Sequence, residues 1–204
     1  MVNKKRSKKK SNKLPLIIGI ISIIIIIIGV YAVTRPSSSP VTSTNPTNVL
    51  LQTSAGNITI QLATDKPITT ANFINIVQKG LYDDTIFHRV MAGFMIQGGQ
   101  INQNIPTMKD EIGTNNRNLP YTIAMAKTNQ PNSATSEFFI NVADNGQKYA
   151  PSFDATYTVF GTVISGKDVV DAIANAPVTA NPNMPGEMSV PVNPVTLVKA
   201  TIVP

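Results

Sequence analysis

Residues 14–33 form a run of 20 without a single charged side chain, and residues 23–28 within it are six consecutive isoleucines. As a helix rising about 1.5 Å per residue, this run would span roughly 30 Å, the thickness of a bilayer's hydrocarbon core. The consecutive isoleucines leave no polar face that a helix packed on a soluble domain could turn to water. We therefore expect a transmembrane anchor at residues 14–33.

The positive charge of the chain is concentrated just before this run. Seven of the 17 lysine and arginine residues lie in the first 13 positions, which contain no acidic residue. The remaining ten basic residues are balanced by 11 acidic residues, so the rest of the chain is nearly neutral. A nucleic-acid partner is therefore not expected. Because basic residues beside a membrane-spanning helix stay in the cytoplasm, we expect a single-pass membrane protein with a cytoplasmic tail at 1–13 and an extracytoplasmic domain.

A cleaved signal peptide is the alternative to an anchor. The tripeptide Val30-Tyr31-Ala32 offers small residues at a plausible cleavage position. The apolar run is longer than the roughly 7–15 residues of a signal peptide's apolar region, so a cleaved, secreted form is the less favoured interpretation. Residues 34–47 are rich in Ser, Thr and Pro, which predicts a linker between the anchor and the domain.

Residues 48–204 are predicted to form one mainly β domain. Short apolar or alternating runs separated by turn residues indicate eight strands, over 49–53, 57–62, 86–91, 94–97, 121–126, 137–142, 158–164 and 195–203. Helices are predicted over 67–80, capped by Thr69 or Thr70, and over 166–174. The Pro- and Asn-rich residues 175–193 are interpreted as a loop without an assigned role. This pattern favours a closed antiparallel eight-stranded barrel capped by two helices.

The composition excludes several kinds of chemistry. The chain has no cysteine and a single histidine, His88, so a disulfide framework, a thiolate nucleophile and a zinc site with several His or Cys ligands are ruled out. It also lacks the Gly-x-Ser-x-Gly, phosphate-loop and dinucleotide motifs. The acidic pairs Asp83-Asp84 and Asp110-Glu111 are expected on the solvated surface. No metal and no cofactor are expected.

Rotation about an X-Pro peptide bond needs none of these groups. It breaks no covalent bond, and its barrier of about 18–20 kcal/mol arises from amide resonance. A catalyst must hold the proline ring in an apolar pocket and favour the twisted bond, whose imide nitrogen accepts a hydrogen bond. A guanidinium suits this task because it is permanently charged and rigidly planar. A millionfold acceleration would require about 8 kcal/mol of preferential transition-state binding.

Four blocks of the sequence, in order, resemble the cyclophilin family of peptidyl-prolyl isomerases. They are Phe87-His88-Arg89-Val90 with Gly93-Phe94-Met95-Ile96-Gln97-Gly98-Gly99, then residues 123–126, residues 132–142, and residues 160–163 with 166–170. The resemblance covers about residues 48–203. It implies a cyclophilin-like domain that assists the folding of exported or surface proteins as an isomerase. The implied partners are proline-containing polypeptides, with the membrane reached through the N-terminal helix, and a monomer is expected.

By this resemblance Arg89 would be the catalytic residue, donating to the prolyl imide region and gripping the substrate carbonyl. Gln97 would orient Arg89. Further substrate-binding residues are implied in three groups: Phe94, Met95, Phe139 and Phe153 as the floor and walls of the proline pocket; Ala126 and Lys127 through their backbone groups; and His88, Glu137 and Tyr157 around the site.

The sequence departs from the family pattern at several of these positions. Lys127 stands where the best-known members carry Asn, Glu137 replaces the usual Gln, and Tyr157 replaces a frequent His. We expect the Glu137 carboxylate to pair with Lys127 or Arg89. The family's tryptophan is absent, with Ser152 nearest its place, which predicts weak binding of cyclosporin. The alternative function is a proline-binding chaperone or scaffold module on the same fold with little turnover.

Overall fold

The computed structural model describes residues 46–149 and 152–204 of the chain. Within this part, the predicted helices are present as α2 (Pro67–Gln78) and α4 (Lys167–Ala174), and a further short helix is α3 (Asn145–Lys148). The strands of the main sheet are β1 (Asn48–Thr53), β2 (Gly56–Leu62), β3 (Thr85–Ile86), β4 (Arg89–Met91), β5 (Met95–Gly98), β6 (Thr122–Met125), β7 (Phe138–Asn141), β8 (Val159–Ser165) and β11 (Thr196–Val203).

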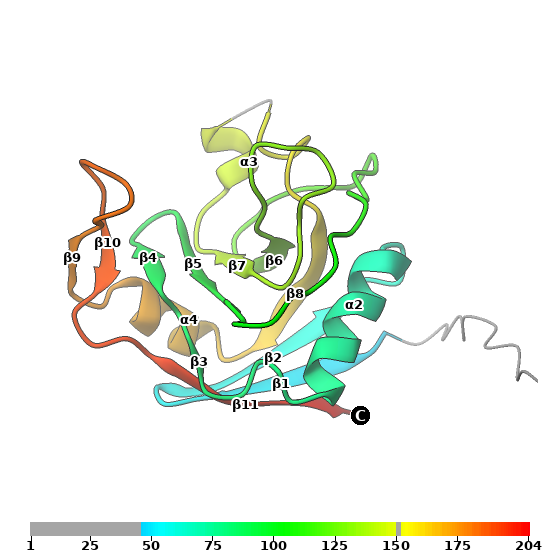
Figure 1. Cartoon of the computed structure of the whole chain (residues 1–204), viewed down its shortest axis with the longest axis horizontal. Helices are drawn as coiled ribbons and strands as arrows, with labels where there is room; N and C mark the ends of the chain where they lie inside the picture. Colours follow the sequence, from blue (N-terminus) through cyan, green and yellow to red (C-terminus); the bar gives the residue numbers. More distant parts are fainter. Residues whose placement is uncertain (1–45, 150–151) are drawn as a thin grey trace, which may run out of the picture. The chain divides into compact units, whose positions relative to one another are not determined.

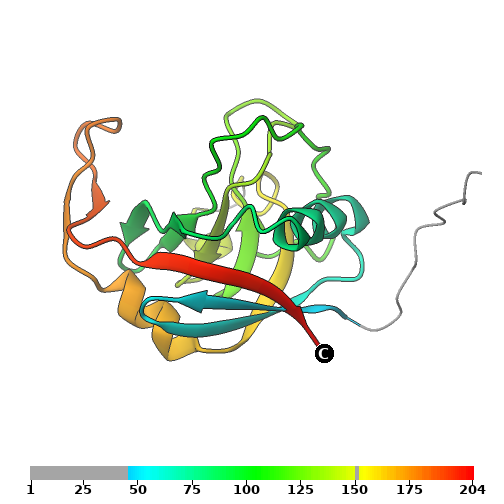
Figure 2. The ribbon, with the colours of Figure 1, turned by 60° about the horizontal axis from the view of Figure 1, so that its bottom comes forward.

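These nine strands form one antiparallel sheet in the order β3-β11-β1-β2-β8-β6-β7-β5-β4 (Figure 1). The sheet curls around the core, with β11, β1 and β2 on one side and β5 and β4 on the other (Figure 2). The mainly β fold with few helices agrees with the sequence prediction. The curled sheet is the frame on which the candidate site is built.

The prediction of a closed, eight-stranded barrel was wrong. The single strand predicted over 86–91 is broken into β3, which pairs with β11, and β4, which pairs with β5. The break falls at Phe87, whose side chain is buried and whose N–H donates to the carbonyl of Val195 at 3.0 Å. The two edge strands are therefore consecutive in the sequence, but no β ladder joins them in the described residues, and the sheet remains a half-barrel.

Helix α2 packs on the sheet through an aromatic cluster. The ring of Phe73, on α2, lies 5.1 Å from that of Tyr82, 5.8 Å from that of Phe138 and 5.0 Å from that of Phe160. All four side chains are fully buried. Burying each such side chain stabilises the fold by roughly 1.5–3 kcal/mol, so this cluster is a main anchor of the core. The Tyr82 hydroxyl donates to the carbonyl of Ser136 at 2.8 Å, which satisfies its one polar group.

The N-terminus of α2 is capped by a residue far away in the sequence, and the predicted cap by Thr69 or Thr70 was wrong. The N-cap residue is Lys66, whose side chain makes no capping bond. Instead, the Glu111 carboxylate accepts from the backbone N–H of Ile68 at 3.1 Å and from that of Thr69 at 2.7 Å. A carboxylate at a helix N-terminus satisfies unpaired N–H groups and complements the helix dipole. Glu111 therefore has a structural contact instead of the expected solvated position.

The predicted loop at 175–193 was also wrong. It contains a two-stranded hairpin formed by β9 (Val178–Ala180) and β10 (Met188–Pro191). The hairpin projects beside β4, at the edge of the main sheet (Figure 1). Alternation of apolar residues is interrupted here by Pro and Asn, so the local pattern gave no strand signal.

Within the described residues, no helix has the length and apolar character needed to span a bilayer. The predicted tail at 1–13, the anchor at 14–33 and almost all of the linker at 34–47 lie outside the described residues.

We predict that Gly99→Ala destabilises the domain by about 2–5 kcal/mol, as the sum of left-handed backbone strain and overpacking. Gly99 has a φ of +75°, and a Cβ there would come within 2.8 Å of the Phe138 ring and 2.9 Å of Tyr82. Urea unfolding measures the change in the free energy of unfolding.

Gly93→Ala is the matched control for this prediction. Gly93 has a similar φ of +67°, but a Cβ added there would meet nothing within 4 Å. It should lose only the backbone contribution of about 1–2 kcal/mol. Equal losses in the two variants would contradict the packing argument.

Candidate active site

A cavity of about 660 Å³ opens on the face of β5 and β7 that points away from the main core. All of the residues singled out from the sequence line this one cavity: His88, Arg89, Phe94, Met95, Gln97, Ala126, Lys127, Glu137, Phe139, Phe153 and Tyr157. Their individual roles remain predictions, but the fold brings the whole set together. Such a volume is in the range that binds small ligands or a few residues of a peptide.

The floor and one wall of the cavity are apolar. Strand alternation places Met95 and Gln97 on the cavity face of β5, while Ile96 between them is buried in the main core. Phe139 lies opposite Gln97 on the neighbouring strand β7. Its ring is 5.9 Å from that of Phe153 and 5.4 Å from that of Tyr157, both in edge-to-face geometry. This end of the cavity can hold a compact apolar ring.

Arg89 lies at the polar end, on the edge strand β4. Its Nη1 donates to Oε1 of Gln97 at 3.2 Å, and its Cζ is 5.9 Å from the centre of the Phe94 ring. The remaining edge of the guanidinium faces Glu187, with Nε donating to Oε1 and Nη2 donating to Oε2, both at 2.7 Å. The charge is therefore held beside the apolar floor by neighbours on two sides.

Glu187 was not identified from the sequence. It follows the turn of the β9–β10 hairpin, 98 positions from Arg89, in a segment without any recognisable motif. The hydrogen bond from Arg89 is the main cause that lowers the pKa of Glu187 to about 2; burial opposes this shift, and Ser189 and Asn181 add smaller contributions to it. Because this pKa is far below neutral, the ion pair is intact throughout the physiological pH range. No local signal could have found this contact.

Glu137 forms the next link of the polar wall, and its expected pairing with Lys127 or Arg89 was wrong. Its Oε2 accepts from Nε2 of Gln97 at 2.8 Å and lies 3.5 Å from Nε2 of His88. The hydrogen bond with His88 is the main cause that lowers the pKa of Glu137, Gln97 adds to it, and burial opposes both. Glu137 is therefore bound to the two polar neighbours nearest the cavity floor.

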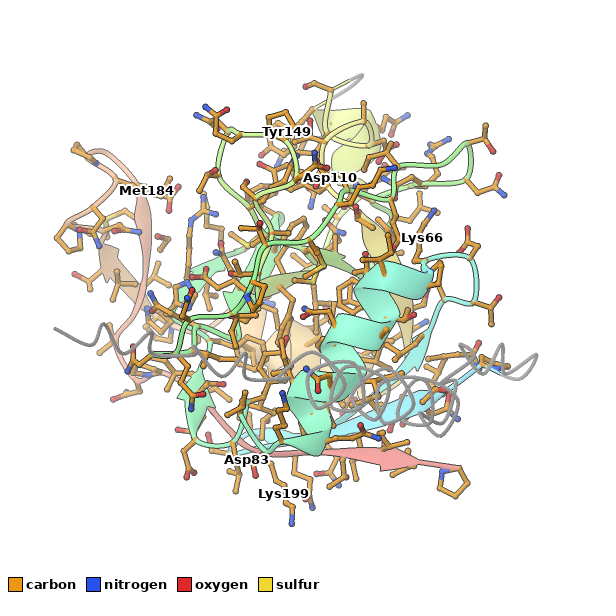
Figure 3. All side chains as sticks on the ribbon, turned by 45° about the vertical axis from the view of Figure 1, so that its right-hand side comes forward. Lys66, Asp83, Asp110, Tyr149, Met184 and Lys199 are labelled. Atoms are coloured by element: carbon orange, nitrogen blue, oxygen red, sulfur yellow. The ribbon has the colours of Figure 1, made fainter. Side chains whose placement is uncertain are left out.

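Lys127 is held by a different carboxylate. Its Nζ lies 2.6 Å from Oδ2 of Asp110, and only 8% of the Lys127 side chain is exposed. Asp110 sits on the long loop between β5 and β6 (Figure 3), and its pairing corrects the expectation that it is a solvated surface acid. The backbone N–H of Ala126 donates to the carbonyl of Glu137 at 2.9 Å. The substrate contacts expected from the backbone groups of Ala126 and Lys127 stay a prediction.

In the described part of the chain, no three His, Cys, Asp or Glu side chains are grouped so that they could hold a metal ion. The Nδ1 atom of His88 is buried, and the structure gives it no hydrogen-bond partner within that part. The chemical resources of the cavity thus include one oriented guanidinium, the Gln97 amide, the paired side chains of His88 and Glu137, and an apolar floor. These can stabilise a polar transition state without proton transfer.

Comparison with known proteins decides the family. A sequence model described as "Cyclophilin type peptidyl-prolyl cis-trans isomerase/CLD" matches residues 48–202. The chain belongs to the cyclophilin-type peptidyl-prolyl cis-trans isomerase family. This assignment confirms the family resemblance and the predicted enzyme class.

Relatives of this cyclophilin are found in several bacteria. Peptidyl-prolyl cis-trans isomerase A of Dickeya dadantii is 42% identical over 168 residues, which cover 79% of this chain and 87% of the relative. A peptidyl-prolyl cis-trans isomerase of Acinetobacter baylyi is 45% identical over 163 residues, covering 76% and 85%. A cyclophilin type isomerase of Cryptosporidium parvum shares the fold, with a TM-score of 0.67, 23% identity, and coverage of 78% of this chain and 98% of that one.

We predict that Glu137→Gln lowers the free energy of unfolding of this cyclophilin by about 1 kcal/mol at pH 7, the typical value of a hydrogen bond in a partly buried site. Because the folded-state pKa of Glu137 is depressed below 4.5, its contribution is present above that value and is lost as the pH falls through the folded-state pKa. Urea unfolding at pH 7 and in steps below pH 4.5 measures the difference between the two proteins.

The variant Asp84→Asn serves as the control, because Asp84 is exposed and asparagine also tolerates its positive φ of 61°. An exposed carboxylate contributes little, so this control should change the unfolding free energy only slightly at any pH. A Glu137→Gln difference that stays constant as the pH is lowered would contradict the assigned cause.

Proposed function

We propose that this cyclophilin catalyses the cis–trans isomerisation of X-Pro bonds in polypeptides, with the Arg89 guanidinium stabilising the twisted bond. The observation that carries the proposal is the position of this charge, 5.9 Å from the Phe94 ring and in the same cavity as Met95 and Phe139. A proline ring seated on the apolar floor would bring its imide nitrogen and carbonyl toward the guanidinium.

The chemistry follows from the origin of the barrier. Amide resonance holds the X-Pro bond planar with a barrier of about 18–20 kcal/mol, and twisting removes this resonance. The imide nitrogen then becomes pyramidal and gains a lone pair that accepts a hydrogen bond. A donor that is already oriented stabilises this state more than the planar one. No proton needs to move in this step, so the proposal assigns no proton transfer to the His88–Glu137 pair.

The substrates are proposed to be proline-containing polypeptides. Support comes from the names of the bacterial relatives. A second Cryptosporidium parvum structure with the same fold, at 24% identity and a TM-score of 0.65, was obtained in the presence of the dipeptide Ala-Pro. Uncatalysed X-Pro isomerisation takes tens to hundreds of seconds, which is slow enough to limit folding, so a catalyst has a clear use.

A proline-binding chaperone or scaffold with little turnover is the second candidate. One observation favours it, since two of the N–H groups of Arg89 are already bonded to Glu187. If the donor were fully engaged, proline would bind but its isomerisation would not be accelerated. Turnover therefore separates the two candidates, because both use the same cavity.

An isomerase assay on a proline-containing peptide with the full-length chain tests the proposal. Arg89→Ala should lower kcat/KM by roughly 10²–10³-fold, the usual cost of removing one transition-state donor. Arg89→Lys should be intermediate, because an ammonium keeps the charge but loses the planar fork. Arg117→Ala is the matched control, since Arg117 is 57% exposed and pairs with Asp154 away from these contacts. Wild-type protein that binds the peptide without accelerating its isomerisation would instead support the scaffold function.

The location of the enzyme is part of the same proposal. Residues 14–33 anchor it in the cell membrane with residues 1–13 in the cytoplasm, and the isomerase domain acts as a monomer on exported or surface proteins. The support is the uncharged apolar run directly after seven basic residues.

Fractionation of cells that express the chain tests this location. Full-length protein should stay with the membranes after alkaline washing, and protease added outside the membrane should degrade the isomerase domain. A variant lacking residues 1–33 should be found in the soluble fraction. A domain that is protected from external protease would refute the proposed orientation, and a chain shortened at its N-terminus would identify cleavage instead of anchoring.

A further inference from the structure

The β9–β10 hairpin brings a second charged residue to the candidate catalytic arginine. Glu187 and Arg89 are paired at 2.7 Å through both carboxylate oxygens, with only 16% and 19% of their side chains exposed. Bidentate pairs of this kind fix the orientation of a guanidinium as well as its position. Part of the hairpin therefore belongs to the site: Asn181, Met184 and Val190 line the cavity, and Figure 3 shows Met184 at the outer end of the hairpin.

The hairpin holds Glu187 through its own backbone. The carbonyl of Glu187 accepts from the N–H of Asn181 at 2.8 Å, and the N–H of Glu187 donates to the carbonyl of Met184 at 3.0 Å. The Asn181 side chain also donates to Oγ of Ser189 across the hairpin at 3.0 Å. With both backbone groups bonded, Glu187 has a defined position from which to hold Arg89.

Counting donors shows what remains for a substrate. A guanidinium has five N–H groups. Two of those on Arg89 are bonded to Glu187, one on Nη1 is bonded to Gln97, and one on Nη2 points to the sulfur of Met91 at 3.4 Å. Among the described residues, this leaves one N–H without an acceptor, on Nη1. It belongs to the nitrogen that is fixed by Gln97, a residue of the cavity wall.

A substrate would not displace Glu187 from this arrangement. The prolyl nitrogen and the peptide carbonyl are neutral acceptors, whereas the carboxylate is charged and makes two short bonds to the guanidinium. Hydrogen bonds between charged partners are roughly twice as strong as neutral ones, and here they are largely shielded from water. The pair is thus expected to persist while a peptide is bound, which makes Glu187 a support of Arg89 and not a competitor of the substrate.

We propose that Glu187 is a positioning residue for the isomerase reaction, holding Arg89 by its Nε–Nη2 edge so that the remaining Nη1 donor is directed to the twisted X-Pro bond. This inference rests on the proposed function. If Glu187 has this role, the β9–β10 hairpin contributes to catalysis, although its segment contains no recognisable motif. Without Glu187, the guanidinium keeps its charge but can leave the productive orientation.

The variants Glu187→Ala and Glu187→Gln test the proposal in the full-length chain. Glu187→Ala should lower kcat by roughly 10–100-fold with KM changed by less than about twofold, because displacing a catalytic group by about 1 Å typically costs on the order of 10²-fold. Glu187→Gln should recover part of this loss, since its amide oxygen can still accept from Arg89. Asp84→Asn removes the charge of an exposed carboxylate that does not line the cavity and should keep the wild-type rate.

A double variant asks whether Glu187 acts through Arg89. In the Arg89→Ala background, Glu187→Ala should cause no further loss of kcat/KM, because the group that it positions is gone. The Nε–H signal of Arg89 in ¹⁵N-labelled protein gives a readout that is independent of turnover. It should be resolved and slow to exchange in wild type and lost in Glu187→Ala. Unfolding midpoints of all variants identify any general loss of structure, in which case the isosteric Glu187→Gln variant decides.

Three outcomes would overturn the proposal. A Glu187→Ala rate equal to that of the wild type would show that the Glu187 carboxylate does not position the Arg89 donor. A higher rate would show that the carboxylate keeps this donor away from the substrate. Additive losses in the double variant would show that Glu187 acts independently of Arg89. All three outcomes require an active wild type, so they differ from a failure of the proposed function, in which the wild type itself would not accelerate isomerisation and the positioning role would fall with it.

Discussion

Strands β5 and β7 carry apolar side chains on both faces, and the arrangement of the molecule depends on this. Ile96 and Phe138 point into the main core, whereas Met95 and Phe139 point to the other side and form the floor of the cavity. A pleated strand sends successive side chains in opposite directions, so two neighbouring apolar residues serve two separate packing surfaces. The core that stabilises the fold and the candidate active-site cavity therefore share the same short strands.

A chain of polar contacts crosses the edge of this floor. It runs from Glu187 through Arg89 and Gln97 to Glu137 and then to His88, the residue next to Arg89 in the chain. Charged groups at the border of an apolar surface are costly unless they are paired, and here each charge meets a partner. The pairing also orients the groups, which is what a reaction without bond breaking requires of its catalyst.

Much of this could be predicted from the sequence because the signals were local. Alternating residues located the strands, and helix patterns located α2 and α4. Family motifs pointed to residues that share one cavity. Several expectations failed where distant segments decide the structure, among them the partners of Glu137 and Asp110. The open sheet results from the break at Phe87, the cap of α2 comes from Glu111, and the hairpin carries Glu187. None of these contacts produces a periodic pattern in the sequence from which it could be predicted.

The sequence by itself determined the class of fold, the family and a set of residues that line one cavity, because strand alternation and ordered motifs are properties of neighbouring residues. Only the tertiary structure decided which charged side chains form ion pairs with each other. Arg89 could have paired with any of several carboxylates, and the choice of Glu187 followed from how the hairpin lies beside β4. Ion pairs act over a few ångströms in space and carry no information about separation along the chain, so only the folded chain can select them.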